Sequence, residues 1–408
     1  MTGTNDASAV VLGEAFIRDR HTLYERLRRK GPVHAAVMPD GLRVWMVTRY
    51  VDARAALASP LLSKDSGRAS PLHDRQALER RTPRARFAEA LNAHMLNMDP
   101  PDHTRLRKLV GKAFTVRRVE LLRQRIEEIT KDLLDELDGR DEAELLGAFA
   151  FPLPLTVICE LFGVPEADRA RFRSWSNIIA RHSYTDAARD ASFSVAELLF
   201  GLVARKRRHP EDDLLTALVQ ASDDDDRLDE VEVVSMAFLL LSAGHETTAH
   251  LIGNSVLTLL SYPDQLAALR ADSALLPKAI EELLRYQGPG GTTTLRFTTA
   301  PVSLGEVEIP EGEFVVIALE SANRDQARFH DADRLDIGRE PNGHLAFGHG
   351  IHHCLGAPLA RLEGQIAIGR LLERFPGLAL AVDPQHLKWR DNMLFRGMET
   401  LPVKLSGG

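Results

Sequence analysis

The stretch that decides the fold reads FGHGIHHCLG and runs from Phe347 to Gly356, directly before a helical pattern that continues to about residue 374. It places a single cysteine, Cys354, in a glycine-rich loop at the start of that helix. The N-terminus of a helix and the backbone N–H groups of a loop both stabilise a thiolate. Glycines let the backbone fold closely around a sulfur atom, because they carry no Cβ. The stretch therefore predicts a cysteine whose sulfur has a chemical task.

Residue types alone leave three interpretations of Cys354. It can be a free, buried cysteine before a helix, which is the common fate of a single cysteine. It can be a zinc ligand, because cysteine and histidine are the usual zinc ligands and four histidines lie close by in the sequence: His344, His349, His352 and His353. Structural zinc sites normally need paired ligands at two places in the chain, and the sequence offers no second pair. The third interpretation is a thiolate that binds haem iron.

The composition narrows the functional class. The 408 residues carry a formal net charge of −7, whereas nucleic-acid-binding proteins are usually basic. Two cysteines cannot form a disulfide framework, which favours a reducing cytosol, and Cys159 lies in an apolar helical pattern typical of core packing. No basic segment leads into an apolar stretch at the N-terminus, and no run of about 18 apolar residues occurs. We therefore expect a cytoplasmic protein that binds neither nucleic acid nor membrane.

The spacing of apolar residues predicts a mainly α chain with small β-sheets. Because no linker or repeat divides it, we expect one domain over residues 1–408, with a loose arm at 1–20. Strands at 33–38 and 43–48, joined across Pro39-Asp40-Gly41, are typical of a hairpin. Helices are predicted at 21–30, 102–113, 116–137, 152–162, 166–182, 187–208, 212–221 and 356–374, further strands at 295–304 and 314–319, and a long mobile loop with one helical piece at 63–93.

One predicted helix is unusually long. Between Leu228 and Ser261 there is no proline, and about 33 helical residues would extend about 50 Å. Its middle, AFLLLSAGHETTAHLIG, is apolar on nearly all sides, so this helix is expected to run through the interior. The buried polar residues in that middle require a reason; they are His245, Glu246, Thr247 and Thr248.

The stretch around Cys354 resembles the haem-binding signature of the cytochrome P450 family, with Phe347, Gly350, His352, Cys354 and Gly356 on motif positions. Two other stretches match the same family in the correct order. Residues 243–248 resemble its oxygen-activating segment, and residues 282–285 match its Glu-x-x-Arg motif. The resemblance extends from the hairpin near residue 33 to the end of the chain and is closest to soluble actinobacterial members. It implies the prism fold of this family, with the long central helix over the haem.

The resemblance also implies a set of site residues. Cys354 is expected to ligate the iron of haem b, and His103, Arg107, Arg296 and His352 to bind the haem propionates. The other residues expected to contact haem are Ala243, Gly244, Phe347, Gly348 and Gly356. The expected substrate pocket consists of Leu240, Ala243, Thr294, Leu295 and Leu394.

Glu246 and Thr247 are the expected catalytic residues. A carboxylate and a hydroxyl can relay protons to bound O₂ through water. The alternative for a threonine in a helix is a hydrogen bond back to a carbonyl one turn earlier. Glu282 and Arg285 are three residues apart and share a helix face; the resemblance gives them a structural role behind the haem loop, with Arg334 or Arg339 as the third member.

The implied function is a monooxygenase that inserts one atom of O₂ into a C–H bond, or forms an epoxide, on a lipophilic compound. A polyketide or macrolide is the first expectation for the substrate, and a steroid or terpenoid the second. Electrons are expected from NAD(P)H through a ferredoxin reductase and a ferredoxin, which docks on a monomer at a basic patch comprising Arg105, Lys108, Lys112, Arg117 and Arg118. The alternatives are a peroxide-driven haem enzyme, a non-catalytic haem-thiolate sensor or carrier, and a zinc-dependent hydrolase.

Overall fold

The computed structural model describes residues 9–80, 88–181, 185–221, 228–340 and 342–406. Within these residues the chain is mainly helical with small sheets, which confirms the predicted fold class. The helices are α1 (Glu14–Arg18), α2 (Arg20–Lys30), α3 (Tyr50–Ala58), α4 (Ser66–Arg80), α5 (Asp102–Ala113), α6 (Val116–Leu121), α7 (Arg123–Asp135), α8 (Pro152–Leu161), α9 (Glu166–Arg181), α10 (Asp186–Arg208), α11 (Leu214–Ala221), α12 (Glu230–Ser261), α13 (Pro263–Ala271), α14 (Leu276–Gln287), α15 (Leu319–Ala322) and α16 (Ala357–Arg374). The strands are β1 (Val10–Val11), β2 (Val33–Val37), β3 (Arg43–Val47), β4 (Leu62–Ser63), β5 (Glu142–Glu144), β6 (Arg296–Thr298), β7 (Val302–Leu304), β8 (Val307–Ile309), β9 (Phe314–Ile317), β10 (Ala379–Leu380) and β11 (Pro402–Lys404).

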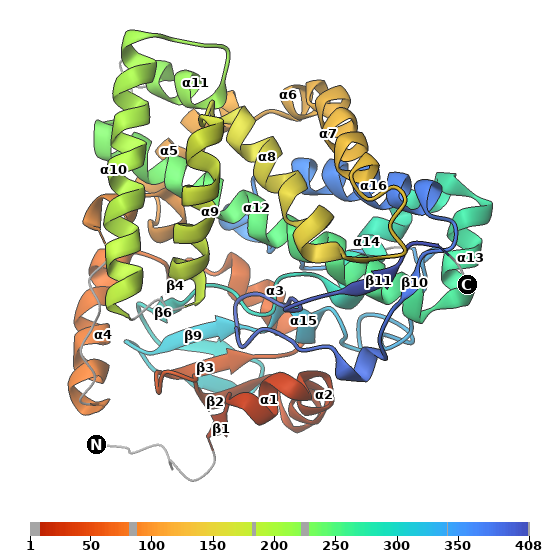
Figure 1. Cartoon of the computed structure of the whole chain (residues 1–408). Coiled ribbons are helices and arrows are strands. Elements are labelled where there is room, and N and C mark those ends of the chain that lie inside the picture. Colours follow the sequence, from red (N-terminus) through yellow and green to blue (C-terminus); the bar gives the residue numbers. More distant parts are fainter. Residues whose placement is uncertain (1–8, 81–87, 182–184, 222–227, 341, 407–408) are drawn as a thin grey trace.

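The largest sheet has the strand order β1-β2-β3-β9-β6-β4. β2 and β3 form the predicted antiparallel hairpin, with Ala35 opposite Trp45, and Gly41 takes the positive φ of 83° that its turn requires. β9 joins β3 in parallel and β6 in antiparallel orientation. Figure 1 shows this sheet near the N-terminus, with most of the helices above it.

The N-terminal segment differs from the loose arm that was expected for residues 1–20. Residues 1–8 lie outside the described residues. From Val10 onward the chain is packed: Val10 and Val11 pair in parallel with β2, and Leu12, Phe16 and Ile17 are buried in the core beside the sheet. The free energy gained by burying these apolar side chains outweighs the conformational entropy that the segment loses when it is ordered.

The predicted central helix is α12, which begins at Glu230, two residues later than expected, and ends at Ser261. Its start is set by a capping box, in which the Asp229 side chain accepts from the backbone N–H of Glu232 and the Glu232 carboxylate accepts from that of Asp229. Most side chains from Val233 to Leu259 are buried. α12 packs against α8, α10, α14 and α16 and runs through the middle of the molecule, as predicted (Figure 1).

Two predicted elements are interrupted. The helix expected at 116–137 divides into α6 and α7, because the N–H of Leu122 bonds to Val119, three residues back, and tightens the last turn of α6. The strand expected at 295–304 divides into β6 and β7. The helical piece expected within residues 63–93 is α4, while residues 81–87 lie outside the described residues.

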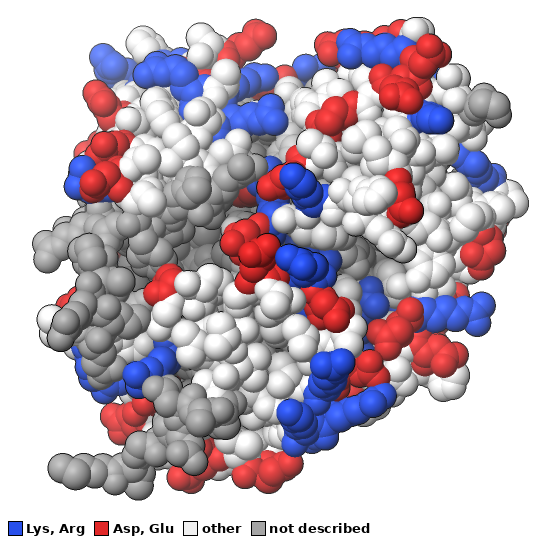
Figure 2. Space-filling model, turned by 60° about the horizontal axis from the view of Figure 1, so that its bottom comes forward, with Lys and Arg blue, Asp and Glu red and all other residues white. Residues whose placement is uncertain are grey.

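Among the described residues, no single helix is long and apolar enough to cross a membrane, although the bent pair Leu146–Leu161 and Glu166–Ile179 passes the same test by length and composition. On the face shown in Figure 2, lysine and arginine side chains are interspersed with aspartate and glutamate. The net charge of −7 is therefore not expressed on this face as one continuous acidic field.

Candidate functional site

The loop before α16 is folded tightly around Cys354. Gly348 and Gly350 have φ values of 71° and 75°, a backbone conformation that side chains disfavour. A Cβ at residue 350 would lie 2.8 Å from the carbonyl oxygen of Leu57 in α3. The N–H of Cys354 donates to the carbonyl of Phe347 at 2.9 Å, which closes the loop. The glycines are therefore required where the sequence placed them.

The surroundings of the Cys354 sulfur suit a thiolate ligand. Burial raises the pKa of the free thiol, but the backbone N–H groups of Gly356 and Ala357 and the guanidinium groups of Arg107 and Arg361 act in the opposite direction. Arg107 is held in place by donating to the carbonyl of His353 at 2.6 Å. Amide donors and cations around a sulfur favour its anionic form.

Cys354 opens onto a cavity of about 310 Å³ that is lined mainly by apolar side chains. The cavity collects most of the predicted site residues from distant parts of the chain. Those that line it are Arg107, Leu240, Ala243, Gly244, Thr247, Thr294, Arg296, Phe347, Gly348, His352, Cys354, Gly356 and Leu394. Three predicted residues are not among the lining residues: His103, Glu246 and Leu295. Leu295 packs against the core beside the sheet, since successive side chains of an extended segment point to opposite faces.

α12 presents small and hydroxyl-bearing residues to this cavity. Gly244 lines it, and its small size is also required by α8, because a Cβ there would lie 3.1 Å from Cδ1 of Ile158. The Thr247 hydroxyl donates to the carbonyl of Ala243 at 2.8 Å. This is the bond to the preceding turn that was the alternative for Thr247, and it leaves the hydroxyl oxygen on the cavity wall as an acceptor.

Glu246 is buried on another side of α12. Its Oε1 lies 2.8 Å from Nη1 of Arg390 and 3.8 Å from Nε2 of His250. Burial acts to raise the pKa of Glu246, but His250 and Arg390 outweigh it and hold the pKa below its usual value. Glu246 and Thr247 are adjacent in the sequence, but their side chains have different partners and only Thr247 lines the cavity. A proton that moves from one to the other therefore has to travel around α12.

One end of the cavity carries an excess of positive groups. Arg296 and His352 line it, and the buried His103 ring lies 4.3 Å from that of His352. Burial, reinforced by nearby positive charge, lowers the pKa of His352 to about 2. Burial lowers the pKa of Arg296 to about 10. Both ring nitrogens of His103 and the Nε of Arg296 have no hydrogen-bond partner among the described residues.

Lys64 belongs to the same end and was not predicted. It follows β4, is buried, lines the cavity and donates its Nζ to the Thr294 hydroxyl. Burial and the charge of Arg296 lower the pKa of Lys64 to about 7. A lysine two residues after the apolar stretch Pro60-Leu61-Leu62 was the available signal, because such a stretch predicts a buried strand end.

These groups fit the propionates of haem. Among the described residues, no ion pair joins Lys64 or Arg296 to a carboxylate. Asp99 acts on both cations through its charge, but its carboxylate accepts from the Ser63 hydroxyl and the backbone N–H of Lys64 instead. Because buried cations are normally paired directly, this end of the cavity favours a ligand with acidic groups. Haem would supply two carboxylates there and would place its iron within reach of a cysteine ligand.

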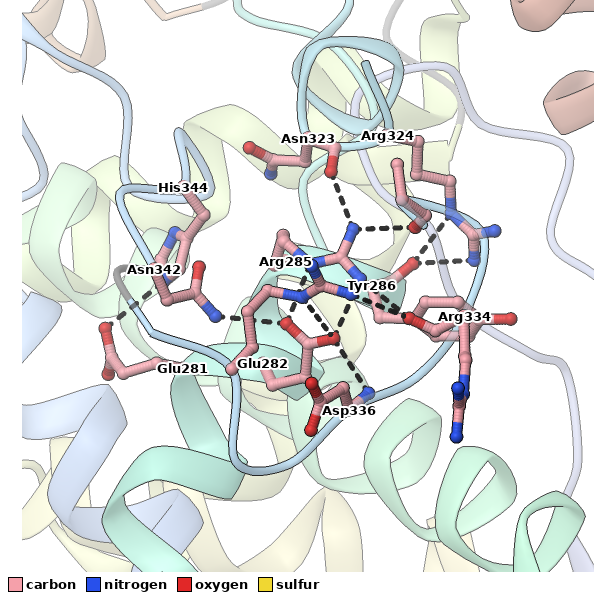
Figure 3. Close-up of polar contacts among 12 residues, drawn as sticks. Glu281, Glu282, Arg285, Tyr286, Asn323, Arg324, Arg334, Asp336, Asn342 and His344 are labelled. Carbon is pink, nitrogen blue, oxygen red and sulfur yellow. Dashed lines mark hydrogen bonds and ion pairs between the residues drawn. The ribbon is translucent and has the colours of Figure 1, made fainter. Parts of the chain in front are cut away.

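The Glu-x-x-Arg pair forms a closed network behind the haem loop (Figure 3). Arg285 bonds to both Glu282 oxygens at 2.7 and 2.8 Å and to the carbonyls of Asn323 and Ala332. The third member is Arg339, whose Nε donates to Glu282 Oε1 at 3.1 Å.

Arg334 contributes its backbone carbonyl to this network rather than its side chain. Asn342 donates to the second Glu282 oxygen. Every strong polar group of the Glu282–Arg285 pair is therefore satisfied internally.

The zinc interpretation gains no support from this geometry, because the described residues contain no group of three or more His, Cys, Asp or Glu placed to hold a metal ion. Cys159 is buried in the core, as expected, and burial raises the pKa of its thiol to about 12.

Comparisons with known proteins agree with the site. The family model described as Cytochrome P450 matches residues 202–394. Cytochrome P450 107B1 of Saccharopolyspora erythraea is 54% identical over 404 residues, which is 99% of both chains. Vitamin D(3) 25-hydroxylase of Pseudonocardia autotrophica is 45% identical over 99% of this chain and 98% of its own length. The solved structure of the tirandamycin C-bound P450 monooxygenase TamI has a TM-score of 0.91 at 50% identity and covers 97% of this chain and 100% of its own. Further relatives are Mycinamicin IV hydroxylase/epoxidase of Micromonospora griseorubida, at 42% identity over 93% of this chain and 94% of its own length, and Polyketide biosynthesis cytochrome P450 PksS of Bacillus subtilis, at 38% identity over 97% of this chain and 98% of its own length.

Proposed function

The chain belongs to the cytochrome P450 family and is a P450 monooxygenase, and from this premise we propose that it oxidises a lipophilic polyketide or macrolide at a C–H bond or a double bond. The observation that carries the proposal is one cavity in which Cys354, Thr247 and predominantly apolar side chains meet. The cysteine suits haem iron, the hydroxyl suits proton handling, and the apolar walls suit a lipophilic compound.

Haem would be held by Cys354 through its sulfur. Its propionates would be bound by Lys64, His103, Arg107, Arg296 and His352. When bound, a haem with a thiolate ligand supplies the activation of O₂, because the thiolate pushes electron density that favours cleavage of the O–O bond. The loop backbone orients the sulfur, and the cations neutralise the propionates in a site that excludes water.

The test of the iron ligand uses the reduced, CO-bound protein. We expect the strongly red-shifted Soret band of thiolate-ligated haem, its loss in Cys354→Ala, and its retention in the matched variant Cys159→Ala. Retention of the band in Cys354→Ala together with its loss in Cys159→Ala would assign the iron to the other cysteine.

Thr247 and Glu246 would handle protons from two sides of α12. The Thr247 oxygen lies on the cavity wall and would accept a hydrogen bond from water while its hydroxyl donates to Ala243. The Glu246 carboxylate, ionised next to Arg390 and His250 on the far side of the helix, would take up a proton from solvent and pass it on toward the cavity. Water has to connect the two groups, because the geometry leaves them unpaired.

The substrate class rests on the relatives and on the cavity walls. Relatives of macrolide and polyketide biosynthesis favour a polyketide or macrolide. A steroid-like compound is the second candidate, because the vitamin D(3) 25-hydroxylase relative covers almost the whole chain. A binding screen that follows the low-to-high-spin shift of the haem iron separates the two classes, since a compound that displaces water from the iron changes the spin state.

The proposed electron route is from NAD(P)H through a ferredoxin reductase and a ferredoxin, which places the reaction in the cytoplasm. Lys108, Lys112, Arg117 and Arg118 are exposed on α5 and α6 near Arg107, whereas Arg105 is engaged with Glu232 of α12. The docking patch is therefore reduced to the four exposed residues. Opposite charge on a ferredoxin would steer the encounter more than it would raise final affinity.

The matched experiment compares turnover supported by ferredoxin, reductase and NADPH with turnover supported by peroxide alone. We expect products only from the first system, with slower turnover at low salt after charge reversal at Lys112 and Arg117. Peroxide-supported turnover of similar rate would favour the peroxide-driven alternative, and haem binding without any turnover would favour a sensor or carrier.

A further inference from the structure

The C-terminal hairpin from Trp389 to Met398 has two functions in the fold. Its base is closed by the bridge between Trp389 and Met398 and by the N–H of Arg390, which donates to the Gly397 carbonyl at 2.9 Å. Its tip carries Leu394 and Phe395, which line the cavity. The hairpin is thus a wall of the substrate site.

The same hairpin is fastened to α12. Arg390 Nη1 lies 2.8 Å from Glu246 Oε1, and the side-chain amide of Asn254 donates to the Arg396 carbonyl at 2.9 Å. Gly397 packs directly on the His250 ring, because a Cβ at residue 397 would lie 2.1 Å from its Nδ1. One short segment, attached to α12, therefore carries both the cavity-lining residues Leu394 and Phe395 and the ion-pair partner of Glu246, Arg390.

One permanent cation and two histidines surround Glu246. Arg390 lies against its carboxylate at 2.8 Å and the His250 ring at 3.8 Å, and His245, on the same helix, also acts to lower the pKa of Glu246. Arg173 of α9 acts on His245 in turn. Burial of a lone carboxylate favours its neutral form, so the charge state of Glu246 depends on these neighbours.

Arg390 is the one of these partners that belongs to the C-terminal hairpin. It also stacks 5.1 Å from the ring of Phe151, whose other contacts include the His250 ring and Arg173. The guanidinium is therefore held by an aromatic surface as well as by the ion pair, with its side chain 11% exposed. Such a fixed cation can orient a carboxylate and transmit movement of the hairpin to it.

We propose that Arg390 is a positioning residue that keeps the Glu246 carboxylate turned away from the cavity and links it to the substrate-contacting tip of the hairpin. This inference rests on the proposed function, because Glu246 is taken there to pass protons toward the cavity. A ligand that presses on Leu394 and Phe395 moves Arg390 through the hairpin and changes the hold on Glu246. Proton supply then follows occupancy of the cavity.

The experiment titrates Glu246 directly by infrared difference spectroscopy of the haem-loaded protein, with Glu246→Gln identifying its carboxyl band. Removal of the cation in Arg390→Met should raise the apparent pKa of Glu246 by about one unit or more. Arg390→Lys should restore most of the wild-type titration. Lys388→Met is the matched control, since it removes an exposed cation from the residue next to this hairpin and should leave Glu246 unchanged.

The link to the cavity is tested with 4-phenylimidazole as the probe. Its binding should shift the Glu246 titration in the wild type and leave it unshifted in Arg390→Met. A Glu246 titration that is identical in wild type and Arg390→Met overturns the positioning role, and a titration insensitive to the probe in the wild type overturns the link. Arg390→Gln provides the same readout if the methionine variant does not fold.

Because these titrations require no turnover, they separate this inference from the proposed function. An inactive protein with a shifted Glu246 in Arg390→Met would retain the positioning role and reject monooxygenation of the compounds tried. An active wild type whose coupling of NADPH to product, solvent isotope effect and pH profile are all unchanged in Arg390→Met would reject the positioning role alone.

Discussion

Two buried clusters of charge in this protein differ in one respect. Behind the haem loop, Glu282 and Arg285 are fully buried, and their charges are met by each other, by Arg339 and by backbone carbonyls. At the end of the cavity, Lys64 and Arg296 are also buried, but they meet a hydroxyl and a carbonyl instead of a carboxylate.

A buried charge that its own fold pairs directly is part of the scaffold, whereas one that has only the more distant charge of Asp99 marks the place of a ligand. The distinction depends on the cost of burying charge, which only a partner of opposite charge can offset. It separates residues that would otherwise look alike, since all four are buried and charged. A variant in the scaffold cluster should therefore lose folding stability, whereas a variant in the cavity cluster should keep its stability and lose haem.

The largest effect is expected from Arg285→Leu. It leaves Glu282 short of its main counter-ion and orphans the carbonyls of Asn323 and Ala332, so the free energy of unfolding should fall by about 3–5 kcal/mol. Urea unfolding of the haem-free protein measures this. A loss below about 1 kcal/mol would show that the network is not a scaffold.

Lys64→Met should not lower the free energy of unfolding of the haem-free protein. It removes a buried cation that no carboxylate contacts directly, so the variant should be as stable as the wild type or more stable. With haem, the loss of one charged hydrogen bond, about 1.5–3 kcal/mol, should accelerate haem release about 10- to 100-fold. Transfer of haem to apomyoglobin measures the rate, and Lys108→Met, on an exposed lysine, is the control. Equal release rates in both variants would remove Lys64 from the haem site.

The pH dependence of stability should differ between the clusters. The pKa of Lys64 is about 7 in the folded chain against an ordinary lysine value of 10.5, so the unfolded state binds more protons between these values and stability should rise with pH across them. Lys64→Met should flatten that rise in the haem-free protein.

Glu281, next to the Glu282–Arg285 pair, should make stability fall at acid pH. Arg361 and His344 outweigh burial and lower its pKa to about 2, so its contribution is present above the unfolded value near 4.5 and is lost as pH falls toward 2. Glu281→Gln should remove that acid-side loss. Unfolding by urea from pH 3 to 10 compares the two variants, and identical profiles would contradict the assignment of both groups.

Thr247→Ala is the smallest expected change in stability and the sharpest exception to the comparison. The Thr247 hydroxyl donates its hydrogen bond within its own helix, to Ala243. In that respect it resembles the internally paired groups of the scaffold, yet it lies on the cavity wall. Stability should change by less than about 1 kcal/mol, while more NADPH should end as peroxide and substrate binding should persist. Unchanged coupling of NADPH to product would place Thr247 with the scaffold after all.

Much of the fold could be predicted because its signals are local. The helical periods, the β2–β3 turn and the glycine-rich loop each depend on residues within a few positions of one another. The division at Leu122 was not predicted, since it depends on a single hydrogen bond to Val119 that leaves the apolar period intact.

The sequence by itself determined the family resemblance, the mainly helical class, the central helix and the cysteine at the cavity, because all of these rest on motifs and periods within one element. Only the tertiary structure decided that Lys64 joins Arg296, that Arg339 rather than Arg334 completes the scaffold, and that Glu246 is held by Arg390, 144 residues away. Which buried charges meet depends on the path of the whole backbone, and a side chain carries no local record of a partner that the fold brings from so far along the chain.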